Sequence, residues 1–213
     1  MIDTIIFDAD GVILDSEDVW DLAHAEILKR RDRIFDREMT KPVIGGRALN
    51  EIADILKKQY DFDANTAELV DETIETVGNL IKERVKFIDG FLDFYNEVSW
   101  NYKTCVATAL NPRLLEIVDR KLDLSKLFSG NVFTIADVGY RSKPAPDIFL
   151  YSAKRMNSNP STCLVIEDSP NGILAAKSAG MRCVGIATTY PRERISKADI
   201  VVNSFSEIKM DGM

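Results

Sequence analysis

Residues that bind transition metals or form disulfides are scarce in this chain. His24 is the only histidine among 213 residues, and the three cysteines, Cys105, Cys163 and Cys183, are widely spaced in apolar stretches. This spacing predicts buried, reduced thiols rather than a disulfide framework. It also argues against a zinc site, which needs clustered histidine and cysteine ligands.

Long hydrophobic runs and excess positive charge are also absent. No window approaches the roughly 18 uninterrupted apolar residues of a membrane span, and the start, MIDTIIFDADG, lacks the features of a signal peptide. The 27 lysines and arginines face 34 aspartates and glutamates, which leaves a formal net charge of −7. We therefore expect a cytoplasmic protein that binds neither membrane nor nucleic acid. For its assembly we expect a monomer or a weak homodimer.

The chain does contain six short β-rich runs, separated by helical stretches. The runs cover residues 4–7, 103–108, 131–136, 163–168, 183–188 and 199–202. Apolar strands that alternate with helices predict an α/β fold, a Rossmann-like three-layer core with a parallel sheet. Residues 16–86 interrupt this alternation with amphipathic helical patterns, which predict an inserted bundle. We expect a discontinuous core of residues 1–15 and 87–213 and a helical cap of residues 16–86.

Acidic residues stand at the end of the first predicted strand. In FDADGV, Asp8 and Asp10 are two positions apart and share a face if the strand continues. Two like charges cannot be buried there without a compensating positive charge. Thr108 and Asp168 follow two other strands, and open α/β sheets bind ligands beyond the carboxyl ends of their strands. We expect these positions to converge on one site.

Four signatures occur in a characteristic order: DADGV, the strand end at Thr108, KPAPDIF and IEDSPNG. With them the chain resembles the haloacid dehalogenase superfamily, in its β-phosphoglucomutase-like branch, over nearly its whole length. The resemblance implies a phosphoric monoester hydrolase that acts on a small phosphorylated metabolite of the sugar, sugar-alcohol or phosphoglycolate type. A β-phosphoglucomutase-like phosphomutase is the alternative.

The residue types suit phosphoryl transfer. We expect Asp8 to attack phosphorus and form an aspartyl phosphate, and Asp10 to protonate the leaving oxygen and then deprotonate water. The family's phosphatases and mutases carry aspartate at the position of Asp10, whereas its dehalogenases and phosphonate hydrolases do not. Lys143 supplies a fixed positive charge. The Thr108 hydroxyl and the Ala109 N–H are expected to bind phosphoryl oxygens.

Mg²⁺ is the expected cofactor, because attack by one anion on another needs a bridging cation that prefers oxygen ligands. Asp168 is the expected ligand from a second strand. In the family the metal is also bound by the side chain at Asp8 and the backbone carbonyl at Asp10. We expect Glu167 to order a metal-bound water. Asn111 is either a helix cap or a substrate contact.

The predicted cap offers candidates for substrate recognition. Its opening, DSEDVW, resembles that of sugar-phosphate phosphatases in this branch, so Trp20 either stacks on a sugar ring or packs in the cap. His24, one turn later, either shares that face or is an ordinary satisfied or exposed histidine. VIGGRALNE resembles the cap's substrate loop, where Gly46 permits tight backbone and Arg47 meets an anion or stays solvated. The mutases place histidine at the Trp20 position, which favours hydrolysis.

Two further classes are less well supported. A receiver-like binding module also carries an aspartate cluster, threonine and lysine on a doubly wound sheet, but the predicted cap and Asp10 argue against it. A non-catalytic relative is disfavoured because no catalytic position is substituted.

Overall fold

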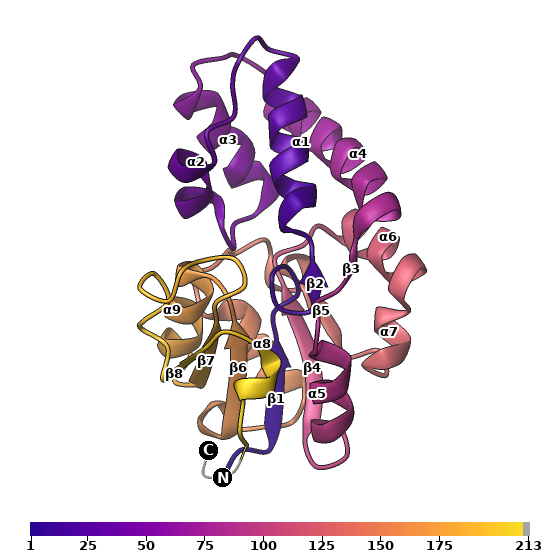
Figure 1. Ribbon diagram of the computed structural model, residues 1–213, viewed down its shortest axis with the longest axis vertical. Coiled ribbons are helices and arrows are strands. Elements are labelled where there is room, and N and C mark those ends of the chain that lie inside the picture. Colours follow the sequence, from indigo (N-terminus) through magenta and orange to yellow (C-terminus); the bar gives the residue numbers. More distant parts are fainter. Residues whose placement is uncertain (211–213) are drawn as a thin grey trace.

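The computed structural model describes residues 1–210 and is built around a parallel sheet of six strands (Figure 1). The strands are β1 (Thr4–Phe7), β4 (Lys103–Thr108), β5 (Val132–Thr134), β6 (Cys163–Glu167), β7 (Arg182–Ile186) and β8 (Ile200–Val202), in the spatial order β5-β4-β1-β6-β7-β8. The predicted α/β class is confirmed. The predicted runs coincide with β1 and β4 and differ elsewhere by one or two residues at an end.

Alternating side chains on the central strand pack against helices on both faces of the sheet. Ile6 belongs to a hydrophobic cluster shared with α8 (Asp147–Arg155) and α9 (Pro170–Ser178). Phe7 points to the opposite face, where its ring lies 5.8 Å from Phe91 and 6.2 Å from Phe94 of α5 (Phe91–Val98). Truncating such a buried ring to alanine costs about 3–5 kcal/mol. This packing fixes β1, and with it the position of the residues that follow.

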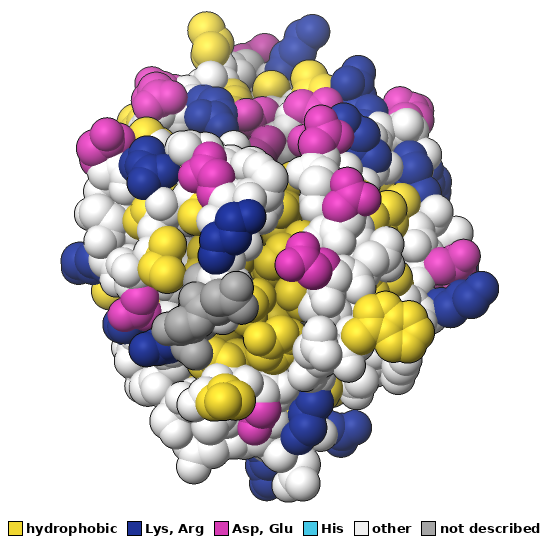
Figure 2. Space-filling model, turned by 60° about the horizontal axis from the view of Figure 1, so that its bottom comes forward, with side chains coloured by type: hydrophobic (Ala, Val, Ile, Leu, Met, Phe, Trp, Pro, Cys, Tyr) yellow, Lys and Arg dark blue, Asp and Glu magenta, His cyan; other side chains and the backbone are white. Residues whose placement is uncertain are grey.

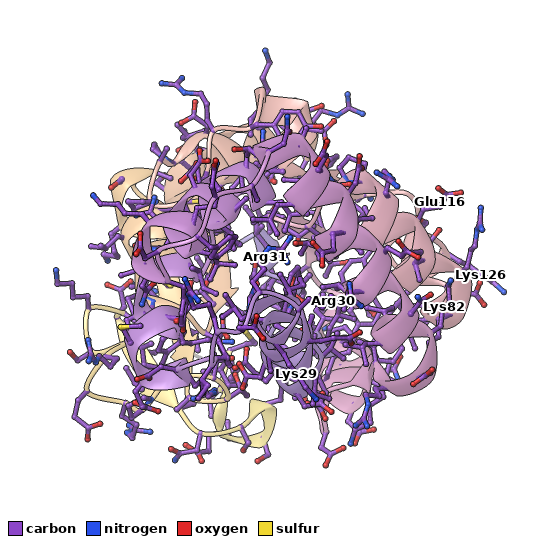
Figure 3. All side chains as sticks on the ribbon, turned by 90° about the horizontal axis from the view of Figure 1, so that it is seen from above. Lys29, Arg30, Arg31, Lys82, Glu116 and Lys126 are labelled. Atoms are coloured by element: carbon purple, nitrogen blue, oxygen red, sulfur yellow. The ribbon has the colours of Figure 1, made fainter. Side chains whose placement is uncertain are left out.

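Four helices lie over the carboxyl end of the sheet (Figure 1). They are α1 (Glu17–Lys29), α2 (Arg37–Ile44), α3 (Leu49–Gln59) and α4 (Thr66–Arg84). α1 and α3 both pack on α4. At the end of α1, Arg30 and Arg31 (Figure 3) form ion pairs with Glu72 of α4, with N–O distances of 3.0 and 2.5 Å.

Two short strands, β2 (Leu14–Asp15) and β3 (Lys86–Phe87), pair antiparallel where the chain enters and leaves these helices. They were not predicted, because two residues carry no readable alternation. The paired strands hold the two ends of the helical segment side by side.

Two helices that follow strands of the six-stranded sheet, α6 (Pro112–Leu122) and α9, begin at side-chain caps. α6, which precedes α7 (Leu124–Leu127), starts after Asn111, whose side-chain oxygen accepts the Arg113 N–H at 2.9 Å. α9 starts after Ser169, whose hydroxyl accepts the Gly172 N–H at 3.1 Å. Each cap fixes the turn that leads away from the carboxyl edge of the sheet.

The surface of the core mixes both signs of charge. Figure 2 shows the end where the N-terminus lies, with acidic and basic side chains interspersed and hydrophobic side chains exposed between them. Among the helices of residues 1–210, none combines the length and apolar character that crossing a membrane requires.

Candidate active site

Three buried carboxylates meet at the carboxyl edge of the sheet. Asp8 follows β1, and Glu167 and Asp168 lie at the end of the neighbouring strand β6. One carboxylate oxygen from each lies within 4.8 Å of the others. The convergence follows from parallel pairing, because adjacent strands end at the same edge.

Lys143 links two of these carboxylates. Its Nζ donates to Asp8 Oδ1 and Glu167 Oε1, each at 2.5 Å, and the side chain is only 2% exposed. Nζ also lies 5.0 Å from the centroid of the Phe149 ring, within the range of a cation–π contact. One lysine therefore serves two carboxylates at the base of the site.

The three carboxylates buried at this edge share a single lysine, Lys143, so negative charge is in excess. Burial, together with Glu167 and Asp10, raises the pKa of Asp8 to about 7 against the opposing effect of Lys143. Burial, Glu167 and Asp8 raise the pKa of Asp168 well above its usual value. Burial alone would lower the pKa of Lys143, but the two adjacent carboxylates raise it, so this side chain stays protonated.

The donor set fits a hard divalent cation. The three carboxylates supply oxygen ligands of the kind Mg²⁺ prefers. A divalent charge placed among them would offset the negative charge that Lys143 leaves uncompensated. The carboxylate of Asp10 does not belong to this cluster; its expected contribution was through its backbone carbonyl.

Glu167 is held from several sides. Its Oε2 accepts the Ser169 N–H and hydroxyl, both at 2.9 Å, while Oε1 accepts Lys143. A Cβ on Gly172 would lie 1.7 Å from Oε1, so only glycine fits there. A similar constraint holds at Gly11, where φ is +75° and a Cβ would lie 1.9 Å from Asp168 Oδ2. The glycines of DADGV and DSPNG thus make room for carboxylates.

Asp10 faces the first helix above the sheet. Its Oδ1 accepts the Ser16 hydroxyl at 2.6 Å and the Trp20 indole N–H at 3.0 Å. Trp20 therefore fixes the orientation of Asp10, a contact that its predicted stacking role did not anticipate. Its ring also lines the cavity between the sheet and the helices.

The strand end at Thr108 contributes backbone to the cavity wall. Thr108 is buried, and its hydroxyl accepts the Leu110 N–H at 3.0 Å. The next residues, Ala109, Leu110 and Asn111, line the cavity. Asn111 caps α6, which is one of its two predicted roles, and it also borders the cavity.

The loop after α2 forms the opposite wall. Gly45, Gly46 and Arg47 all line the cavity, which encloses about 90 Å³. The Arg47 guanidinium is not free, because it donates to Val43 O and to Glu51 Oε2, each at 2.8 Å. Arg47 precedes α3 and Glu51 lies in the first turn of that helix, so the pair depends on how the loop enters the helix.

Core side chains hold this loop in place. Asn171 Nδ2 donates to Gly45 O and the Tyr190 hydroxyl donates to Lys41 O, both at 2.8 Å. Tyr190 and Lys41 also line the cavity and carried no signal in the sequence. These bonds tie the helical segment to the core around the carboxylates.

Comparison with known proteins gives this arrangement a context. Residues 2–180 match the model of the hydrolase family described as haloacid dehalogenase-like hydrolase. The chain is 29% identical to the "Probable pseudouridine-5'-phosphatase" of Drosophila melanogaster, covering 96% of this chain and 90% of that protein. It is 26% identical to hexitol phosphatase B of Escherichia coli K12, covering 95% and 92%. The crystal structure of β-phosphoglucomutase from Clostridium difficile superposes with a TM-score of 0.81 at 29% identity, over 99% and 94%.

Proposed function

The chain belongs to the haloacid dehalogenase-like hydrolases, and we propose that it is a Mg²⁺-dependent phosphatase. Its proposed substrate is a small phosphorylated metabolite of the sugar, sugar-alcohol or phosphoglycolate type, which it hydrolyses through an aspartyl phosphate. Relatives named as phosphatases of small phosphorylated metabolites support the general activity. The observation that carries the detailed proposal is the buried cluster of Asp8, Glu167 and Asp168 bridged by Lys143.

In the first step, an Asp8 oxygen attacks phosphorus and the bond from phosphorus to the ester oxygen breaks. Asp10 gives its proton to the departing oxygen, which leaves as an alcohol. Lys143 keeps Asp8 oriented and offsets charge on the phosphoryl group. The Thr108 hydroxyl and the Ala109 N–H donate to the phosphoryl oxygens.

In the second step, Asp10 takes a proton from water while the water oxygen attacks phosphorus. The bond between phosphorus and Asp8 breaks, which releases inorganic phosphate and restores the carboxylate. The hydrogen bonds from Ser16 and Trp20 hold the Asp10 side chain in a fixed orientation for both proton transfers.

The metal is assigned to Asp8, Asp168 and the backbone carbonyl of Asp10, with Glu167 placed to order a metal-bound water. Bound Mg²⁺ would neutralise charge that develops on the phosphoryl oxygens. Residues 16–86 are assigned as a cap that excludes water from the transfer and contacts the leaving group.

Hydrolysis is favoured over mutase turnover by two features of the cap. Trp20 stands where the mutases of the family carry histidine, and Arg47 is paired with Glu51 rather than left to bind a second phosphate. The test is a phosphate-release screen over phosphorylated metabolites with Mg²⁺, in which NMR follows both products. Inorganic phosphate should accumulate with a dephosphorylated sugar or polyol. An isomerised sugar phosphate that forms faster than phosphate would establish the mutase instead.

A further inference from the structure

His24 is a buried polar residue on the part of the cavity lining that comes from residues 16–86, which is called the cap wall below. It lies on α1, is 1% exposed and belongs to the cavity lining. Within residues 1–210, neither Nδ1 nor Nε2 has a hydrogen-bond partner. Buried polar atoms are nearly always paired, so an unpaired imidazole beside a binding cavity calls for a functional explanation.

The surroundings of His24 keep it uncharged. Burial and the nearby Lys41 lower its pKa to about 4, while Asp21 acts in the opposite direction. Asp21 is itself engaged, because its Oδ2 accepts Arg37 Nε at 2.6 Å. A neutral imidazole has one N–H donor and one nitrogen acceptor, which together match a hydroxyl group.

The charged groups around this wall are already paired with one another. Lys41 Nζ lies 2.5 Å from Glu17 Oε1, and Arg47 lies 2.8 Å from Glu51. Glu17 also lines the cavity and accepts Arg37 at 3.1 Å. A second anionic group on the leaving group would therefore meet cations that have partners and a nearby carboxylate.

The remaining cap side chains of the lining are largely apolar. They are Trp20, Ile44, Leu49 and Ile52. The Trp20 ring lies 5.9 Å from the His24 ring, centroid to centroid, so a flat apolar surface and a neutral hydrogen-bonding group stand side by side. Sugars and polyols combine C–H surface with hydroxyl groups, and this pair of side chains complements both.

We propose that His24 determines substrate specificity by hydrogen bonding to a hydroxyl of an uncharged, polyhydroxylated leaving group. The inference rests on the proposed phosphatase activity and narrows it, because phosphoglycolate and bisphosphates become poor substrates. His24 contacts the substrate away from the reacting phosphorus and takes no part in proton transfer.

The experiment compares three variants on three substrates in the presence of Mg²⁺. His24→Phe keeps a flat ring without polar atoms, His24→Gln restores a donor and an acceptor, and Lys29→Gln is the control. Lys29 is exposed at the end of the same helix (Figure 3). The substrates are sorbitol 6-phosphate, phosphoglycolate and acetyl phosphate, and melting temperatures verify that each variant is folded.

The wild type should prefer sorbitol 6-phosphate to phosphoglycolate by at least about 10-fold in kcat/KM. His24→Phe should lower kcat/KM for sorbitol 6-phosphate by roughly 10- to 100-fold, mainly through KM. It should change acetyl phosphate by less than about 3-fold, since that substrate has no hydroxyl to bind. His24→Gln should recover part of the loss, and Lys29→Gln should match the wild type.

Three outcomes would overturn the inference. Equal losses on sorbitol 6-phosphate and acetyl phosphate in folded His24→Phe would mean that His24 acts through Trp20 and Asp10. An unchanged sorbitol 6-phosphate rate in His24→Phe would remove the proposed contact. Wild-type preference for phosphoglycolate would refute the uncharged leaving group. These results all differ from failure of the proposed function, in which the wild type releases phosphate from none of the substrates, acetyl phosphate included.

Discussion

The core wall and the cap wall of the cavity differ in how their charges are arranged. On the core wall, Asp8, Glu167 and Asp168 share one lysine, Lys143, and negative charge remains uncompensated. Such a site attracts a metal ion and a phosphoryl group, and it does so for any phosphate ester.

On the cap wall, charged side chains are paired with neighbours of opposite charge. Lys41 pairs with Glu17 and Arg47 pairs with Glu51, while His24 is neutral and Trp20 presents its ring. Under the proposed function, this difference means that the core wall performs the chemistry and the cap wall selects the leaving group. Changes in the core should therefore affect phosphate esters with and without a sugar, and changes in the cap should depend on whether the leaving group is a sugar or polyol.

The largest effect is expected from Asp8→Asn, which keeps the shape but removes the nucleophilic anion. Activity should fall by more than about 10³-fold on every phosphate ester. The measurement is phosphate release with purified protein whose mass excludes deamidation. Asp93→Asn, at an exposed position on α5, is the matched control. More than a few per cent of residual activity would remove Asp8 from the nucleophile role.

Asp10→Asn should lower turnover by about 10²- to 10⁴-fold for substrates with poor leaving groups. The first step with an activated aryl phosphate should suffer much less, because its leaving group needs little protonation. Single-turnover phosphorylation with both substrate types makes the comparison. Equal losses would argue that Asp10 acts by position or metal binding and not as an acid.

The pH dependence of folding stability should show that His24 on the cap wall is uncharged. His24 has a folded-state pKa of about 4, below the usual 6.5, so the folded protein binds fewer protons than the unfolded chain between these values. Stability should fall as pH drops from 6.5 towards 4, by up to about 3 kcal/mol. Urea unfolding of wild type and His24→Phe at pH 7.5, 6 and 5 isolates this contribution.

His24→Phe should lose less stability over that pH range than the wild type. The raised pKa of Asp8 acts with the opposite sign, since protonation on folding favours the folded state at lower pH, but it is common to both proteins. Identical pH profiles would show that His24 is not held neutral.

The smallest effect is expected from a change at Trp20, which lies on the cap wall and donates a hydrogen bond to Asp10 of the core. Trp20→Phe keeps a ring but removes the N–H that Asp10 accepts, so kcat should fall by about 3- to 10-fold on poor leaving groups. Because the contact orients Asp10, the loss should extend to phosphate esters that lack a sugar. A loss confined to sugar phosphates would instead favour stacking as the main role of Trp20.

The residues of the core wall could be predicted from the sequence because the order of the parallel strands determines where they lie. Buried parallel strands end at one edge, so a motif that follows β1 and another that follows β6 must meet there. The fold class was predictable from the strand pattern, and the family from the four signatures that resemble it. Asp8, Glu167 and Asp168 come together because β1 and β6 are adjacent parallel strands.

The contacts made by side chains of the cap wall could not be predicted in this way. The bond between Trp20 and Asp10 spans ten residues and depends on the angle at which α1 leaves the sheet. The unpaired state of His24 depends on everything packed around it, including Phe35, whose ring lies 5.6 Å away. Helical periodicity identifies a shared face but not the partners that face meets.

The most direct test of this division locates the phosphoryl group during turnover. Sorbitol 6-phosphate and acetyl phosphate are each mixed with enzyme and Mg²⁺, quenched within milliseconds and treated with borohydride, which reduces an aspartyl phosphate to homoserine. Peptide mass spectrometry should find homoserine at position 8 with both substrates, and His24→Phe should slow its formation only with sorbitol 6-phosphate. Homoserine at position 10, or phosphate release without any reduced aspartate, would contradict the assignment of the chemistry to Asp8 on the core wall.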